Sequence, residues 1–317
     1  MPESHRSAPS TVLVTGASGR IGSAVVDRLR ARGERVIALD RRHRQRKRLP
    51  DSAKNNNPGV IEVVGDCTDE HAVDRAFRAA EPTGGIDRIV HLAALAHMTA
   101  GTPIEVFGTN VVSTFTVLAV GAQHRVRRAV IASSIHATGL LGHHLRPLPD
   151  RFPLDEEQTA HLDDWYSLSK AVDELSAGMV ASRWEMSVIA LRFPLVQSRP
   201  ELEATCRRYG ADPERALREG WTYLDSDEAA RAVTCGLDAD TSGSHALHVA
   251  APDTLIETPT EELLDRYAPD VPRTRPFEGF AAPIDTSLAS RTIGFTGRSR
   301  HDRADLDHHN PAEEQSR

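Results

Sequence analysis

The chain contains few of the residues that build disulfide frameworks and metal centres. Its three cysteines, Cys67, Cys206 and Cys235, are odd in number, far apart and outside any Cys-x-x-Cys spacing. We therefore expect buried or idle thiols rather than a disulfide network or a zinc site. The pair His143 and His144 has no acidic or cysteine partner at ligand spacing, so we expect no metal there either.

Long apolar runs are also missing. No uninterrupted run approaches the roughly 18 residues of a membrane span, and the first residues, Met-Pro-Glu-Ser-His-Arg, lack the apolar core of a signal peptide. A net charge of −7 argues against nucleic acid as the main partner. The sequence thus predicts a cytoplasmic protein without a membrane or nucleic-acid partner. With 317 residues, 39% of them hydrophobic, it can bury a full core and a smaller second lobe.

Lysine is scarce, with only Lys47, Lys54 and Lys170 in the chain, yet Lys170 follows Tyr166 at a spacing of four. On a helix two such side chains share one face. An ammonium group beside a tyrosine hydroxyl favours the phenolate, which can act as a general base toward an alcohol. The pair therefore predicts alcohol–ketone oxidoreduction.

Short apolar segments alternate with helical patterns along the chain. The expected strands are 12–14, 35–39, 60–64, 86–92, 129–132 and 187–191, and the expected helices are 21–32, 69–80, 103–123 and 163–184. This alternation predicts an α/β fold with a doubly wound parallel sheet. In the last helix Leu168, Val172, Leu175 and Met179 recur at helical spacing, so we expect them to face the sheet. Residues 50–59 are expected to form a surface loop.

The first strand runs directly into Gly16-Ala-Ser-Gly19-Arg-Ile-Gly22, and a helical pattern follows at once. Glycines permit a tight turn and close approach of the backbone, and the start of the helix offers free N–H groups to a pyrophosphate. The sequence therefore favours a dinucleotide site here. The alternative is an ordinary strand-to-helix turn.

The Gly-x-x-Gly-x-x-Gly turn and the Tyr-x-x-x-Lys pair together resemble the short-chain dehydrogenase/reductase superfamily, specifically its extended branch, the NAD-dependent epimerase/dehydratase family. The resemblance implies a Rossmann domain that binds NAD at 11–194. It also implies a small C-terminal substrate lobe at 195–296, with segments that return to the main sheet. Residues 1–10 and 297–317 are polar and charged, and we expect them to be disordered tails.

Asp40 ends the second strand about 20 residues after the glycine turn, where a carboxylate can accept hydrogen bonds from the adenosine ribose and repel a 2′-phosphate. This favours NAD. The basic run 41–48 that follows could neutralise such a phosphate, so NADP stays open, and the alternative is a solvated loop. The resemblance implies that Asp66 holds the adenine; otherwise it caps a helix.

The full cofactor set implied by the motifs and the resemblance extends along the ends of the strands. In it Asn110 matches the family's structural asparagine, with a solvent-facing helix residue as the alternative. The set is Gly16, Gly19, Arg20, Ile21, Gly22, Asp40, Asp66, Cys67, Leu92, Ala93, Ala94, Asn110, Tyr166, Lys170 and Pro194.

Three residues form the catalytic set, which is Ser134, Tyr166 and Lys170. The resemblance places a hydroxyl after the fifth strand, which selects Ser134 with Ser133 as the fallback. In the family that hydroxyl holds the substrate oxygen against the tyrosine, while the lysine binds the nicotinamide ribose.

The pattern is closest to the uronate dehydrogenases, which share Ala-Ser-Ser-x-His with residues 132–136 and an arginine with Arg192. The resemblance makes Ser134, Ile135, His136 and Arg192 the substrate contacts. Two polar residues of the uronate dehydrogenases are replaced here. The asparagine after the second serine is Ile135, and the serine near the end of the fourth strand aligns with Ala96. Because two polar substrate contacts are lost, we expect a substrate that is less polar or differently substituted. His136 could instead cap or pack, and Arg192 could pair with a carboxylate at the lobe boundary.

These observations predict an NAD-dependent oxidoreductase acting on a small sugar, sugar acid or sugar-derived alcohol. Dehydration is disfavoured because Ile135 and His136 replace the Asp-Glu pair of dehydratases. An epimerase with bound NAD and a nicotinamide-sensing regulatory protein remain the alternatives. Helix 103–123 carries more apolar positions than one sheet-facing stripe requires, which predicts a homodimer; packing against the loop 139–152 is the alternative.

Overall fold

The computed structural model describes residues 9–43, 59–139, 145 and 147–301. Most of the expected surface loop at 50–59, the basic residues 44–48 and the pair His143 and His144 lie outside the described residues. So do residues 1–8 and 302–317 of the two expected tails.

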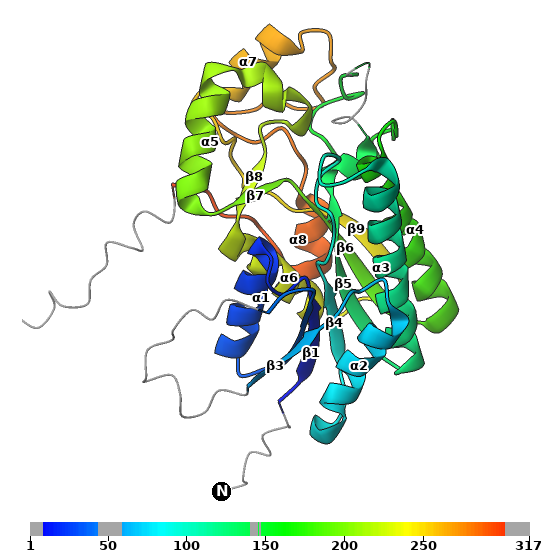
Figure 1. Cartoon of the computed structure of the whole chain (residues 1–317). Helices are drawn as coiled ribbons and strands as arrows, with labels where there is room; N and C mark the ends of the chain where they lie inside the picture. The colour runs from blue at the N-terminus through cyan, green and yellow to red at the C-terminus, as the bar shows by residue number, and fades with distance from the viewer. Residues whose placement is uncertain (1–8, 44–58, 140–144, 146, 302–317) are drawn as a thin grey trace, which may run out of the picture.

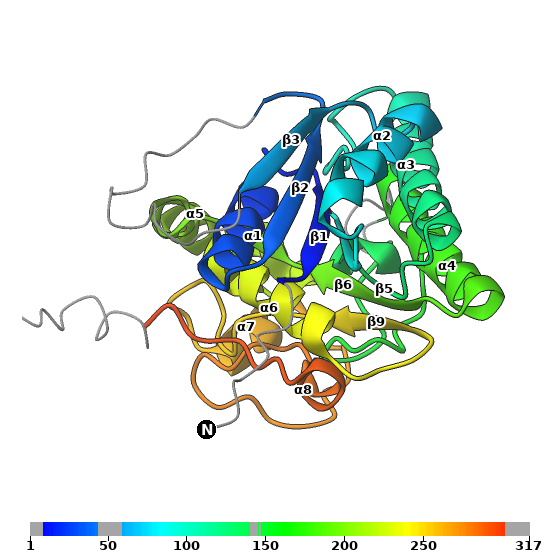
Figure 2. The same ribbon diagram turned by 90° about the horizontal axis from the view of Figure 1, so that it is seen from below.

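Seven parallel strands form one sheet in the order β3-β2-β1-β4-β5-β6-β9 (Figures 1 and 2). The strands are β1 (Thr11–Thr15), β2 (Arg35–Asp40), β3 (Val60–Val64), β4 (Arg88–His91), β5 (Arg128–Ser134), β6 (Ser187–Phe193) and β9 (Ser244–His248). The strand order reverses between β1 and β4, and ligands of such sheets bind beyond the carboxyl ends of the strands at this switch point. The predicted fold class is confirmed.

Helices cover both faces of the sheet. One face packs against α1 (Arg20–Ala31), α6 (Ser226–Asp238) and α8 (Ser287–Ile293), and the other against α2 (Glu70–Ala80), α3 (Pro103–Gln123) and α4 (Trp165–Trp184). Each interface forms its own apolar core. All five residues of β1 are buried, as expected for a central strand of a sheet covered on both faces.

Side-chain caps define where the helices begin. Asp69 accepts a hydrogen bond from the His71 backbone N–H at the start of α2. Thr102 and Glu105 form a reciprocal capping box at the start of α3, and Pro103 occupies the first helical position. These local signals explain why the predicted starts of both helices lie within one residue of the observed ones.

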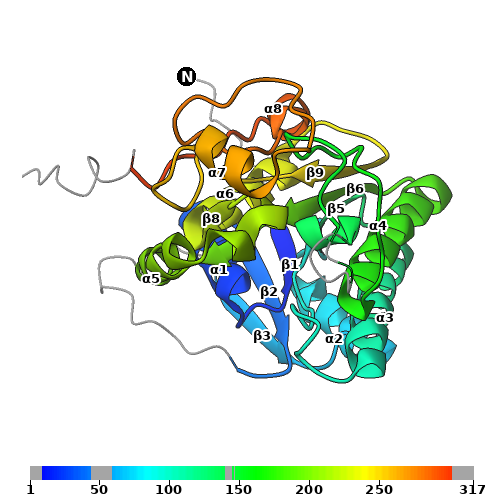
Figure 3. The ribbon, with the colours of Figure 1, turned by 90° about the horizontal axis from the view of Figure 1, so that it is seen from above.

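A smaller lobe lies beyond the carboxyl ends of the strands (Figures 1 and 3). It contains β7 (Leu195–Gln197), β8 (Tyr223–Asp225), α5 (Arg199–Ala211), α7 (Thr260–Tyr267) and the 3₁₀ helix η4 (Pro213–Glu219). β7 and β8 pair in parallel as a separate two-stranded sheet. The chain then returns to the main sheet as β9, which pairs with β6.

The boundaries predicted for the two tails are wrong by a few residues. Ser299 is buried and donates to Asp253, and the Arg300 backbone N–H donates to the Tyr223 hydroxyl at 2.9 Å. At the other end, Ser10 donates to the Asp87 carboxylate. Polar composition suggested disorder at 297–301, but the Ser299 hydroxyl and the Arg300 backbone N–H are bound by the lobe.

The predicted inner face of α4 is also wrong. Leu168, Leu175 and Met179 are 41%, 72% and 39% exposed, whereas the buried face carries Lys170 and Asp173 together with serines. The polar residues are buried because they form the hydrogen-bonded site described below. Ala177 and Val180 supply the apolar part of the buried face, and the three predicted residues above lie on the outer face. On the neighbouring α3, Ile104, Val112 and Phe115 are 86%, 46% and 43% exposed. We call these six exposed residues the α3–α4 stripe.

By length and composition α3 is apolar enough to cross a membrane. In the structure, 44% of its apolar window is buried. It lies over the sheet in contact with both α2 and α4, which is the position of a core helix.

Candidate active site

The glycine turn between β1 and α1 leaves no room for side chains. Gly16 has φ +63°, and a Cβ there would lie 2.7 Å from the Ala93 backbone nitrogen. A Cβ on Gly22 would lie 2.1 Å from the Gly16 carbonyl oxygen. Both positions require glycine, so the turn approaches β4 and the first turn of α1 as closely as a dinucleotide site needs.

The start of α1 has no side-chain cap. Its N-cap is Gly19, and no side chain accepts from the first backbone N–H groups of the helix. These donors suit a pyrophosphate. The Arg20 guanidinium, by contrast, binds the lobe, since it donates to the Val196 carbonyl oxygen at 3.0 Å and to Glu201 at 2.8 Å.

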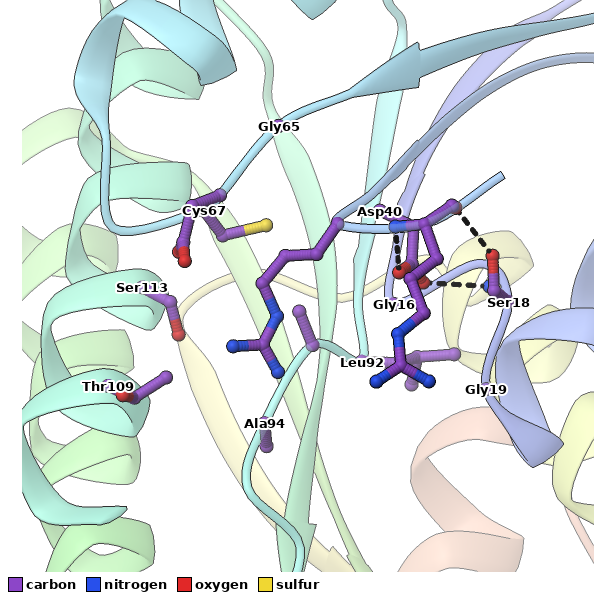
Figure 4. A pocket seen from close by; sticks show the side chains of 14 residues that line it. Gly16, Ser18, Gly19, Asp40, Gly65, Cys67, Leu92, Ala94, Thr109 and Ser113 are labelled. Carbon is purple, nitrogen blue, oxygen red and sulfur yellow. Dashed lines mark hydrogen bonds between the residues drawn. The ribbon is translucent and has the colours of Figure 1, made fainter. Parts of the chain in front are cut away.

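A cavity of about 340 Å³ lies between the glycine turn and the end of β2 (Figure 4). The Asp40 carboxylate accepts from the Ser18 backbone N–H at 2.9 Å and from that of Arg42 at 3.1 Å. These bonds hold Asp40 at the cavity wall. Other predicted cofactor residues lining it are Gly16, Gly19, Asp66, Cys67, Leu92, Ala93 and Ala94, and Arg41 and Arg42 line it as well.

Asp66 does not cap a helix, which was the alternative to a contact with the adenine, because the N-cap of α2 is Asp69. One carboxylate oxygen of Asp66 accepts from the Thr68 backbone N–H and hydroxyl, each at 2.9 Å, which shapes the turn after β3. The residue also lines the cavity. Burial raises the pKa of the adjacent Cys67 thiol to about 12, so this thiol stays protonated and unreactive.

Asn110 lines neither the cavity beside Asp40 nor the second cavity described next, so its assignment as a direct cofactor contact is corrected. It is fully buried, accepts from the Leu95 backbone N–H at 2.8 Å, and donates to the Leu95 carbonyl oxygen and to the Ser169 hydroxyl. It therefore ties the segment after β4 to α3 and α4. A solvent-facing position is excluded.

A second cavity, of about 490 Å³, joins the glycine turn to the lobe. All three predicted catalytic residues line it. The other predicted residues in its wall are Gly16, Gly19, Arg20, Ile21, Gly22, Leu92, Ala94, His136 and Pro194. Four of these, Gly16, Gly19, Leu92 and Ala94, line the first cavity too, so the two spaces adjoin.

Asp164 positions the start of α4 and was not among the residues predicted from the sequence. It caps α4 by accepting from the backbone N–H groups of Tyr166 at 2.9 Å and Ser167 at 2.8 Å. This places Tyr166 in the first turn and Lys170 one turn later on the same face. The Asp-x-x-Ser pattern at 164–167 was an available capping signal.

The Lys170 ammonium is buried and held from two sides. It donates to the Ala132 carbonyl oxygen at 2.9 Å and to Asp173 at 3.0 Å, and lies 6.0 Å from the centre of the Tyr166 ring. Burial alone lowers the pKa of this ammonium, but the neighbouring Asp173 and Tyr166 outweigh it, so the pKa is raised. Lys170 is therefore a permanent positive charge beside the tyrosine.

Two adjacent serines at the end of β5 have different partners. Ser133 donates its hydroxyl hydrogen to Glu174 at 2.5 Å, so this hydrogen is not available to a substrate. Ser134 accepts from the His136 backbone N–H at 3.1 Å, and this bond leaves its own proton available. The geometry therefore favours Ser134 over Ser133 as the donor to a substrate oxygen.

The His136 ring lies beside the catalytic tyrosine. The two ring centres are 5.4 Å apart with an interplanar angle of 78°. Burial lowers the pKa of His136 to about 4, so the ring is neutral near pH 7. His136 thus offers a neutral hydrogen-bonding group to the cavity rather than a charge.

Two predicted substrate contacts do not reach the cavity. The Arg192 guanidinium forms a bidentate pair with Glu174, with nitrogen–oxygen distances of 2.9 and 2.8 Å, as in the alternative of a carboxylate partner. Ile135 is buried in the apolar core of the lobe, beside Phe152 and Trp221. Neither side chain lines the cavity, although Ile135 follows β5 and Arg192 lies on β6 as predicted.

Two lobe residues in the cavity wall carried no sequence signal. Glu219 ends η4 and Tyr209 lies in α5. Burial raises the pKa of Glu219 to about 7. No metal-binding group of three or more His, Cys, Asp or Glu side chains occurs in the described part of the chain.

Glu219 gives a stability prediction. The folded-state pKa of Glu219 lies above the ordinary value of 4.5, so protonation of its carboxyl group adds to the free energy of unfolding. This stabilisation is fully present below about pH 4.5 and is lost as the pH rises through about 7. We expect Glu219→Gln to gain free energy of unfolding relative to the natural protein between about pH 5 and pH 8, on the order of 1–3 kcal/mol. Denaturant unfolding at both pH values measures it. An exposed residue of the same 3₁₀ helix provides the control, Glu214→Gln. A difference that does not change with pH would contradict the assignment.

Three curated proteins show what the chain is similar to. It is 35% identical to sterol demethylase protein B of Methylococcus capsulatus over 130 residues, 41% of this chain and 36% of that protein. It is 27% identical to UDP-glucose 4-epimerase of Halalkalibacterium halodurans over 188 residues, 57% and 49% of the two chains. It is 25% identical to uronate dehydrogenase of Pseudomonas putida over 185 residues, 57% and 59% of the two. The chain thus spans about half the length of these relatives.

A solved structure matches over nearly the whole chain. MoeE5 in complex with UDP-glucuronic acid and NAD is 26% identical, with a TM-score of 0.62, and the match covers 92% of this chain and 94% of MoeE5. The family model described as "NAD dependent epimerase/dehydratase family" matches residues 12–211. These residues include the glycine turn and the Tyr166–Lys170 pair on which the predicted resemblance rests. The chain belongs to the NAD-dependent epimerase/dehydratase family.

Proposed function

We propose that the protein is an NAD-dependent oxidoreductase that acts on a hydroxyl group of a small sugar-like alcohol. The observation that carries this proposal is the single cavity lined by Ser134, Tyr166 and Lys170, which adjoins the glycine turn. A hydroxyl donor, a general base and a fixed cation in one wall are what alcohol oxidation requires.

The residues of the first cavity suit NAD. The glycine turn and the uncapped start of α1 would hold its pyrophosphate, and Asp40 would accept from the adenosine ribose. Lys170 uses two of its three N–H groups on Ala132 and Asp173, which leaves one for the nicotinamide ribose. When bound, NAD accepts the hydride from the substrate carbon.

The protein's own residues handle the proton and the substrate oxygen. Ser134 donates its hydroxyl hydrogen to the substrate oxygen and so holds it near Tyr166. The Tyr166 phenolate removes the hydroxyl proton as the carbon–oxygen double bond forms. Lys170 stabilises the phenolate through its permanent positive charge, and neutral His136 packs against the tyrosine ring and limits its movement.

An epimerase with bound NAD is the second candidate, and the relatives named as UDP-sugar 4-epimerases favour it. Such an enzyme oxidises and re-reduces one carbon, so NADH does not accumulate. A nicotinamide-sensing regulator is a third candidate, but such a protein has no need for the catalytic pair. A turnover screen with free sugars and UDP-sugars, in which NADH and epimer formation are measured together, separates the three.

The first prediction from the proposed function concerns the general base. We expect Tyr166→Phe to lower turnover on the order of 10²–10⁴-fold while NAD affinity changes little, because the hydroxyl acts on the substrate proton. Steady-state kinetics and NAD titration measure the two effects. Near-normal turnover of the phenylalanine variant would rule out this role for Tyr166.

Lys170→Ala provides the contrast. We expect it to weaken both NAD binding and turnover, because one ammonium serves both. An alanine variant that lost turnover alone, with NAD affinity intact, would separate Lys170 from the cofactor.

The second prediction concerns cofactor choice. We expect kcat/KM to favour NAD over NADP, and Asp40→Ala to narrow that preference, because it removes the carboxylate that repels a 2′-phosphate. Arg41 and Arg42 line the same cavity and set the residual NADP activity. This prediction would be contradicted if the natural protein had a higher kcat/KM with NADP than with NAD. An Asp40→Ala variant whose ratio of kcat/KM for NAD to that for NADP is unchanged would also contradict it.

We also propose that the α3–α4 stripe is covered by a second copy of the chain. Its six apolar residues lie on two adjacent helices at the surface of the described structure, and closed two-fold pairing is the commonest way to bury such a face. The alternative cover, the loop 139–152, leaves these residues exposed in the part that is described.

Sedimentation tests this assembly. We expect a dimer at micromolar concentration, and a monomer for the double variant Phe115→Glu and Leu175→Glu, because two charges per chain would have to be buried. The control is Phe280→Glu, a similarly exposed residue outside the stripe. A natural protein that sediments as a monomer would contradict the proposal.

A further inference from the structure

In the described part of the chain, the Glu219 side chain has no hydrogen-bond or ion-pair partner. It lines the reaction cavity from the lobe, whereas Tyr166 and Lys170 line it from the Rossmann domain. Within the described residues its carboxyl group forms neither a hydrogen bond nor an ion pair, and only its backbone carbonyl is used, by Thr222. Glu219 is half-buried in the cavity wall, and a carboxyl group there without a partner is available to a ligand, since such groups are normally paired or hydrogen-bonded.

The other charged and titratable groups in this wall do not compensate for it. Those groups are Arg20, His97, His136, Tyr166, Lys170 and Tyr209. Arg20 is paired with Glu201, and Lys170 with Asp173. His136 is neutral, and the His97 ring bonds the Thr99 hydroxyl at 2.9 Å.

The cavity wall therefore offers an acid but no uncommitted guanidinium or ammonium near the lobe. Arg192, the cation expected to hold a substrate carboxylate, is committed to Glu174. A uronate or a nucleotide diphosphate would bring negative charge beside Glu219 without a matching cation from the described wall. Like charges in a desolvated cavity repel strongly, whereas a hydroxyl or ammonium group would supply the hydrogen-bond donor that Glu219 lacks.

We propose that Glu219 is a specificity-determining residue: it binds a hydrogen-bond-donating group of the substrate and excludes anionic substrates. The substrate is accordingly a sugar-sized polyol or amino polyol with zero or positive charge. This inference rests on the proposed oxidoreductase function for the identity of the cavity, and it names the class of alcohol that the cavity takes. A hydroxyl group and an ammonium group can both donate a hydrogen bond to the Glu219 carboxylate, and the test below distinguishes them.

The test compares three probes of one stereochemistry: galactose, galactosamine and galacturonate. Affinity for the NAD-saturated protein is measured by calorimetry at about pH 8, above the pKa of about 7 of Glu219, and NADH formation is recorded separately. The variants are Glu219→Gln, which keeps the shape, and Glu219→Ser, which also shortens the side chain. Glu214→Gln is the matched control, since Glu214 is exposed on the same 3₁₀ helix and does not line the cavity.

We expect galactose or galactosamine to bind at least about tenfold more tightly than galacturonate, and both Glu219 variants to lose that discrimination. Tighter binding of galactosamine than galactose identifies an ammonium partner, and the reverse order identifies a hydroxyl. Binding without NADH formation would overturn the oxidoreductase function but not the role of Glu219. Preferential binding of galacturonate, discrimination that persists in both variants, or binding of none of the three probes would overturn the inference.

Discussion

The buried ammonium of Lys170 is the interaction on which the site depends. It joins the end of β5, through the Ala132 carbonyl oxygen, to the first turns of α4, through Asp173. A lone buried ammonium would lose its proton, but Asp173 and Tyr166 keep it charged. The catalytic tyrosine, the strand that carries Ser134 and the proposed ribose contact are therefore held around one fixed charge.

Hydrogen bonds from neighbouring elements fix the positions of the Lys170 ammonium and the Tyr166 side chain relative to each other. Asp164 caps α4 and so fixes Tyr166 in the first turn, while Asn110 links α4 to the segment after β4 through Ser169 and Leu95. This arrangement leaves apolar side chains of α4 exposed at the surface. Because polar groups occupy much of the inner face of α4, three of its apolar side chains, Leu168, Leu175 and Met179, lie outside and form half of the α3–α4 stripe.

Local motifs predicted the fold well, and the three residues that they selected as catalytic, Ser134, Tyr166 and Lys170, line one cavity in the structure. The glycine turn and the Tyr166–Lys170 pair depend on residue type at short spacing, and a single sequence displays both. The inner face of α4 was predicted wrongly because helical periodicity identifies an apolar face but not what covers it. A polar inner face satisfied by neighbouring elements is a tertiary property.

The substrate side was predicted less well for the same reason. Arg192 was correctly located on β6, but its partner Glu174 lies on α4, 18 residues earlier in the chain, and no motif links the two. Glu219 comes from a 3₁₀ helix of the lobe and belongs to no motif, so only the packing of the lobe over the strand ends reveals it. The proposed substrate contact therefore depends on packing between distant segments, whereas the proposed catalytic residues belong to short motifs.

A double-mutant cycle on turnover tests the central claim most directly, that Tyr166 and Lys170 act as one catalytic unit. The cycle compares Tyr166→Phe, Lys170→Ala and the double variant at saturating NAD, with NADH formation on the alcohol that the natural protein oxidises. The account predicts strong non-additivity: once the phenol is gone, removal of the ammonium costs little more in turnover. Two losses that multiply independently would contradict it.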